Sequence, residues 1–148
     1  MLKAFSIKLF ACMALVFTLS VQAEQTQTFG KYEVHYNAFN SSFLQPKVAA
    51  SYDIQRSKYR SLVNITVLRK EPDGTLKPVQ AFIKGNVRNL IQQSNELNFR
   101  PIIEQDAIYH IADFKVASQD TFTFTLDIQP DPNKPAFTLS FRQTLYPN

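Results

Sequence analysis

The 148-residue sequence contains one cysteine, three glycines, two histidines and no tryptophan. A single cysteine excludes an intramolecular disulfide framework and any metal site built from several thiolates. Three glycines exclude a glycine-rich phosphate-binding loop, since such a loop needs several residues without a Cβ. The sequence therefore lacks the residues of several common catalytic and cofactor-binding motifs.

The N-terminal segment has the pattern of a secretory signal peptide. Lys3 and Lys8 accompany an apolar run over residues 9–19, and Val21-Gln22-Ala23 places small residues at the two positions that a signal peptidase reads. The uncharged run is shorter than the about 20 apolar residues of a membrane-spanning helix. We predict a signal peptide, residues 1–23, that is cleaved after Ala23. We also expect a periplasmic chain, residues 24–148, without a transmembrane segment.

The exported chain carries little net charge. The full sequence has 16 Lys and Arg residues against 12 Asp and Glu residues. Removal of Lys3 and Lys8 leaves 14 basic residues (16 minus 2) against the same 12 acidic ones. Because nucleic-acid binding needs a concentrated cationic surface, we expect no nucleic-acid partner.

Apolar and polar residues alternate along the exported chain, which is the pattern of β-strands. The clearest example is 121–128, where Phe and aliphatic residues alternate with Thr and Asp. About seven strands are predicted, at residues 32–38, 61–68, 79–85, 97–103, 107–115, 121–129 and 136–145. Turn residues separate them, and Gly85 is expected to mark a bulge or bend. We predict one all-β domain over 24–148, an antiparallel immunoglobulin-like β-sandwich.

One long connection, residues 39–54, interrupts the strand pattern. Pro46 suits the first position of a short helix, on which Val48 and Tyr52 would share a face. Asp53 tolerates the left-handed conformation that ends many helices. The helix either closes the open end of the sandwich with apolar side chains or, as long loops often do, belongs to a functional surface.

A basic stretch, Arg56-Ser57-Lys58-Tyr59-Arg60, follows the connection. In an extended chain its three cations share one face. They form either a solvated strand face that discourages edge pairing or a patch that binds an anion or an acidic partner. The functional interpretation assigns ligand or partner binding to Tyr52, Arg56, Ser57, Lys58, Tyr59 and Arg60.

Several motifs resemble a family of small Gram-negative periplasmic proteins that is catalogued only as a domain of unknown function. The motifs are Leu44-x-Pro46-x-Val48-Ala49-x-x-Tyr52-x-Ile54-x-Arg56-Ser57-Lys58, His35-Tyr36-Asn37-Ala38-Phe39, Phe99-Arg100 and Asp106-Ala107-Ile108-Tyr109. The resemblance implies an all-β exported domain and no known activity.

Catalytic and metal chemistry have little support in the sequence. The exported chain has no Gly-x-Ser-x-Gly motif and no thiol, and no base accompanies Ser57. Glu104 and Asp106 resemble a solvated acidic pair. His35 and His110 lack the spacing of metal ligands, so we expect one surface and one near-core imidazole. We predict no catalytic residue, no metal and no cofactor.

The leading hypothesis is a noncatalytic binding or accessory module. It would engage an envelope protein or an anionic ligand through the connector, residues 40–60. A first alternative is chaperone-like capture of an extended peptide at a sheet edge, which needs a long edge strand without inward charge or proline. A second alternative is a hydrolase that uses Ser57 or the acidic pair.

Overall fold

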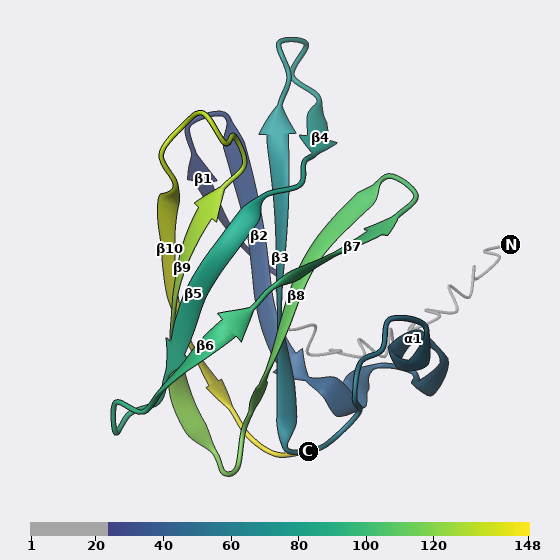
Figure 1. Cartoon of the computed structure of the whole chain (residues 1–148), viewed down its shortest axis with the longest axis vertical. Helices are drawn as coiled ribbons and strands as arrows, with labels where there is room; N and C mark the ends of the chain where they lie inside the picture. Colours follow the sequence, from purple (N-terminus) through teal and green to yellow (C-terminus); the bar gives the residue numbers. More distant parts are fainter. Residues whose placement is uncertain (1–23) are drawn as a thin grey trace, which may run out of the picture.

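The computed structural model describes residues 24–148, which form two antiparallel sheets packed face to face (Figure 1). The predicted signal peptide lies outside the described residues. Sheet A has the strand order β1-β2-β3-β8-β7, with β4 paired to the far end of β3, and sheet B has the order β10-β9-β5-β6. The predicted all-β sandwich is confirmed.

Ten strands of residues 24–148 make up the two sheets. They are β1 (Gln25–Phe29), β2 (Tyr32–Asn40), β3 (Arg60–Lys70), β4 (Leu76–Pro78), β5 (Phe82–Arg88), β6 (Ser94–Asn98), β7 (Arg100–Glu104), β8 (Ala107–Lys115), β9 (Asp120–Gln129) and β10 (Phe137–Leu145). A 3-10 turn, η1 (Ser41–Phe43), and one helix, α1 (Pro46–Ser51), lie between β2 and β3. Among residues 24–148, no helix is long and apolar enough to cross a membrane.

The strand count exceeds the predicted seven because β1 and the short β4 were missed and because the predicted strand 97–103 is divided between the two sheets. The chain leaves sheet A after β4, crosses at residues 79–81 and enters sheet B as β5. It returns at Phe99, where β6 of sheet B gives way to β7 of sheet A. The alternation of apolar residues continues through such a crossing, so the sequence pattern does not reveal it.

The core lies between the inner faces of the sheets, and its aromatic rings cluster around Phe124. The Phe124 ring stacks on Phe141 with centroids 4.5 Å apart and meets Phe114 edge-on at 5.5 Å. Tyr36 of β2 packs on Phe141 at 4.5 Å. These contacts join β2 and β8 of sheet A to β9 and β10 of sheet B, as the alternation in 121–128 predicted.

Gly85 sits in a regular ladder, and the bulge or bend predicted there is wrong. It pairs with Leu126 on β9 and with Leu97 on β6. A Cβ at this position would lie 2.1 Å from the backbone oxygen of Thr125. Glycine is therefore required for close strand approach rather than for a change in strand direction.

Candidate functional site

The connector between β2 and β3 packs on the outer face of sheet A. The helix starts at Pro46, as predicted, and Asp53 adopts the left-handed conformation with φ 53°. Ala49, Leu62 and Ile102 are buried but stand apart from the core between the sheets. In strand β3, Leu62 points away from that core, because its neighbour Val63 points into it.

The prediction that the helix closes the open end of the sandwich is therefore wrong. Figure 1 shows α1 outside the two sheets, beyond β8 and β7. Val48 remains 39% exposed, whereas Ala49 is the helix residue that is buried. Ala49 is the helix residue that packs toward sheet A, and Val48 faces water. The helix is therefore rotated relative to the predicted orientation, in which Val48 and Tyr52 share the buried face.

Polar contacts with β7 hold the connector in place. The Tyr52 hydroxyl donates to Oε2 of Glu104 at 2.6 Å, and this hydrogen bond raises the pKa of Tyr52 above its ordinary value of 10.0. The Arg100 guanidinium donates to the backbone oxygens of Tyr52 and Asp53. Tyr52, a predicted binding residue, is thus engaged within the molecule.

Two of the three predicted cations also make intramolecular contacts. Arg56 donates from Nε to the Leu44 oxygen at 2.7 Å and from Nη2 to the Ser42 oxygen at 3.0 Å. Arg60 forms an ion pair with Asp113 on the outer face of sheet A. Lys58 is exposed, with its Nζ 5.0 Å from the centroid of the Tyr59 ring. Residues 56–59 are not part of a strand, so the cations do not form one extended stripe.

Ser57 takes part in a local network of backbone and hydroxyl groups. Its N–H donates to Oγ of Ser41 at 2.9 Å, and the Ser41 hydroxyl donates to the Ser57 oxygen at 3.0 Å. Its own Oγ accepts from the Tyr59 N–H at 3.1 Å. Within residues 24–148, no histidine or carboxylate is hydrogen-bonded to Ser57, so its contacts are those of a turn residue.

The two histidines occupy different environments, as predicted. His110 is buried, its Nε2 accepts from the Ala81 N–H at 3.0 Å, and its Nδ1 contacts the Ile65 oxygen at 3.1 Å. His35 lies on the outer face of sheet A, with Nε2 2.6 Å from Oε1 of Glu33. The described part of the chain holds no group of three His, Cys, Asp or Glu residues placed to bind a metal ion.

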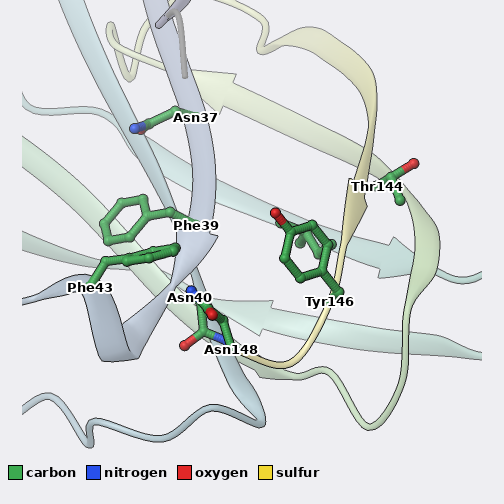
Figure 2. Close-up of a pocket in the computed structure, with 8 residues that line it drawn as sticks. Asn37, Phe39, Asn40, Phe43, Thr144, Tyr146 and Asn148 are labelled. Atoms are coloured by element: carbon green, nitrogen blue, oxygen red, sulfur yellow. The ribbon is translucent and has the colours of Figure 1, made fainter. Parts of the chain in front are cut away.

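A concave site that the sequence did not predict lies where β2 and β10 approach each other. Its cavity volume is about 440 Å³, and we call it the edge notch (Figure 2). In Figure 2, Phe39 and Phe43 lie on one side of β2 and Tyr146 on the other. The side chains that line it are uncharged: Asn37, Phe39, Asn40, Phe43, Thr144, Leu145, Tyr146 and Asn148.

The edge notch exists because β1 pairs with only part of β2. The register ends at Gln25 opposite Tyr36, although β2 continues to Asn40. Beyond Tyr36, the Ala38 oxygen accepts a hydrogen bond from Nε2 of Gln143 on β10 at 2.6 Å. The two sides are more than 100 residues apart in sequence, so only the fold brings them together. Phe43, which lies in the long connection between β2 and β3, and Tyr146 are the exposed aromatic residues of this site.

The fold and the site define a small antiparallel β-sandwich domain with an external connector and an uncharged notch at one edge. The chain belongs to the family described as Domain of unknown function (DUF4426), whose model matches residues 26–148. This finding confirms the resemblance that the sequence motifs indicated. No curated protein matches the chain.

Solved structures agree with this assignment. A crystal structure of a DUF4426 family protein (PA0388) from Pseudomonas aeruginosa PAO1 has 38% sequence identity and a TM-score of 0.75, covering 86% of this chain and 98% of that one. FetP of uropathogenic Escherichia coli strain F11, as isolated, has 15% identity and a TM-score of 0.59, covering 84% and 94%. A copper-bound FetP variant has 16% identity and a TM-score of 0.56, covering 83% and 95%. At these lower identities the likeness to FetP concerns the fold alone.

Proposed function

We propose that this protein is a noncatalytic periplasmic binding module that engages an envelope partner through the edge notch. The observation that carries the proposal is one concave site where the end of β10 meets the last residues of β2. Beyond Tyr36, β2 still pairs with β3, but its other edge is no longer paired with β1 in the described chain. The notch includes Asn40 and Phe43, at the start of the connector that the sequence singled out.

The side chains around the notch favour a partner with an uncharged contact surface. Phe43 is 62% exposed and Tyr146 is 54% exposed. Covering two aromatic side chains beside a cavity removes apolar area from water, which favours binding. No charged side chain lines the notch among the described residues, so an anionic ligand finds no countercharge there.

The notch also contains an acceptor without a partner. The buried Oδ1 atoms of Asn37 and Asn64, which are paired across β2 and β3, make no hydrogen bond to any group in residues 24–148. A buried acceptor left unpaired costs about 1–3 kcal/mol. Asn37 lines the notch, but its Oδ1 atom is buried, so a partner reaches this acceptor only if the side chains that cover it move.

The periplasmic location rests on the signal-peptide pattern of residues 1–23. It is supported by FetP, a protein of the same fold that was recombinantly expressed in the periplasm of E. coli.

Copper binding, which is stated for the FetP variant, does not carry over to this chain. Residues 24–148 contain neither cysteine nor methionine, and copper sites depend strongly on sulfur and imidazole ligands. Both ring nitrogens of His110 contact backbone groups, and His35 contacts a carboxylate. The donor set does not fit the metal, and we propose no copper function.

Site-specific photocrosslinking in cells tests the proposed function. A photoreactive amino acid replaces Phe43, Tyr146 or, as the control, Leu76, which is 43% exposed and belongs to β4. Figure 1 shows β4 at the end of the molecule opposite the C-terminus. We expect the same adduct from both notch positions and none from Leu76. Adducts of equal yield at all three positions, or none at either notch position, would contradict the proposal.

A further inference from the structure

Strand β10 has a long edge that pairs with no strand of residues 24–148. It pairs with β9 over nine residues, from Phe137 to Leu145, and stands last in sheet B. Its inward-facing residues carry no charge, and the strand contains no proline. Inward-facing charge and proline usually protect an edge strand from pairing with another chain, and β10 has neither. The β10 edge therefore meets the requirement for capture of an extended peptide, which is a long edge strand without inward charge or proline.

The other sheet edges of the described chain are better protected. In sheet A, β1 and β7 have five residues each, and β7 contains Pro101. In sheet B, β6 also has five residues. Short strands and proline disfavour addition of a strand. The one charged residue of β10, Arg142, faces outward and is exposed. The nine-residue edge of β10 is the exception among them.

Sheet A extends one strand beyond sheet B on this side. Tyr32 and Tyr36 of β2 pack against Phe137 and Phe141, so β10 lies opposite β2. Strand β1 lies beyond β2, and no strand of sheet B in residues 24–148 lies opposite it.

The inner face of β1 confirms this arrangement. Gln25 and Gln27 pair with Tyr36 and Val34, whose side chains point into the core, yet both glutamines are exposed. The inner face of β1 and the free edge of β10 therefore border an open space. At one end of this space Phe29 stacks on Phe137, with the ring centroids 4.3 Å apart. The edge notch lies at the other end of this space, beside the last residues of β10.

We propose that an extended segment of a partner polypeptide adds to the free edge of β10 and lies beneath β1, with one end in the edge notch. This inference rests on the proposed binding function and names its ligand class. Main-chain hydrogen bonds to β10 provide affinity, and side chains at alternate positions provide specificity. The added strand would stand opposite β1 and complete the sandwich on this side.

The surroundings define the chemistry of the captured segment. Its inward side chains face Gln25 and Gln27, where a charge would lose hydration without meeting an opposite charge. Uncharged polar or small residues fit these positions. At the notch, an aromatic or aliphatic residue can contact exposed Phe43 or exposed Tyr146, which both line it. The segment therefore alternates, with an uncharged inward face and an apolar residue at one end.

A selected peptide provides the probe for the test. The protein is expressed from its full gene, purified from the periplasm and used to select binders from a displayed library of nine-residue peptides. The selected peptide is then synthesised with N-methyl groups at even or at odd positions. One N-methyl series should bind about tenfold or more weakly per methyl group and the other near normally, because only alternate N–H groups bond to β10.

Hydrogen exchange and a matched pair of variants complete the test. Bound peptide should slow amide exchange in Phe137–Leu145. Gln27→Lys places a charge inside the space and should weaken binding at least tenfold, whereas Thr28→Lys, on the opposite face of β1, should leave the affinity within about twofold. Failure to select any peptide, equal effects of the two N-methyl series, or unchanged exchange in β10 would overturn strand capture.

The outcomes separate this inference from the function on which it rests. If Phe43→Ser weakens binding while Gln27→Lys and N-methylation do not, the notch binds a ligand but strand capture is wrong. If the partner crosslinks through neither Phe43 nor Tyr146, the binding function itself fails. A dimer in analytical ultracentrifugation whose β10 amides are protected without peptide would assign the edge to a second copy of the chain and overturn the proposal.

Discussion

The Nε2 atom of His110 accepts a hydrogen bond from the backbone N–H of Ala81, at 3.0 Å, where the chain crosses from sheet A to sheet B. The other ring nitrogen, Nδ1, donates to the Ile65 oxygen on β3. The imidazole must be neutral to accept at Nε2 and donate at Nδ1. A buried neutral histidine thus satisfies a backbone donor that the sheet ladders leave unpaired at the crossing.

Stability should fall as the pH drops below about 6.5. Burial lowers the pKa of His110 below its ordinary value of 6.5, outweighing the hydrogen bond to Ile65, which raises it. Between the folded and unfolded pKa values the unfolded chain binds more protons, so the free energy of unfolding decreases with decreasing pH, by at most about 1.4 kcal/mol per pH unit for this group.

Urea denaturation between pH 8 and pH 5 provides the measurement. In the His110→Gln variant this part of the pH dependence should be absent, although the variant is less stable at every pH. An identical dependence of unfolding free energy on pH in the variant and the natural protein would show that His110 does not control it.

Replacement of Gly85 by alanine should be severely destabilising. The new Cβ would clash with backbone atoms of Thr125 and Leu126 in the adjacent strand, and these atoms cannot move without disturbing the ladder. We expect a loss of about 3 kcal/mol, at the upper end for overpacking. Gly30→Ala is the control, since its Cβ meets no atom within 4 Å and only the positive φ of 58° costs energy, about 1 kcal/mol. Equal losses in thermal or urea denaturation would refute this explanation of Gly85.

The basic stretch should divide into structural and free cations. Arg56→Gln removes two hydrogen bonds to the connector backbone and should lower stability by about 1 kcal/mol, whereas Lys58→Gln should have an effect near zero. Denaturation of the two variants checks this difference.

The predicted binding role of Arg56, Lys58 and Arg60 is tested by partner crosslinking in the triple glutamine variant. Unchanged crosslinking there would dismiss the stretch as a binding surface.

The exported protein should begin at Glu24. The signal pattern predicts cleavage after Ala23, and strand β1 begins at Gln25, so cleavage there leaves the strand intact. Intact-mass spectrometry of the protein from the periplasmic fraction provides the check. An N-terminus beyond Gln27 would remove half of β1, and retention of residues 1–23 would refute the predicted processing.

Local alternation was sufficient to predict most of the strands. In β9, Phe122, Phe124, Leu126 and Ile128 are buried, as their spacing of two residues requires. The helix start at Pro46 and the left-handed Asp53 also followed from single-residue conformational preferences. These predictions succeeded because each depends on a backbone preference or a periodicity contained in a few consecutive residues.

The candidate site was predicted less well. The cations of the basic stretch were chosen for their charge, but Arg56 and Arg60 bind groups within the molecule. The edge notch combines Phe43 with Tyr146, which no sequence spacing connects. Strand β1 was missed because its polar residues, Gln25 and Gln27, point inward at a place that sheet B does not cover.

Amphipathic strands and the signal pattern for export can be recognised from the residues alone, since both properties are contained in short runs of residues. The strands that stand at the sheet edges, the places where the chain crosses between sheets and the polar groups that remain available are known only once the chain is folded. Those features depend on hydrogen bonds between strands far apart in sequence, such as that from Gln143 to Ala38. A pattern of alternating residues indicates which face of a strand is buried, but it carries no information about which strand lies beside it.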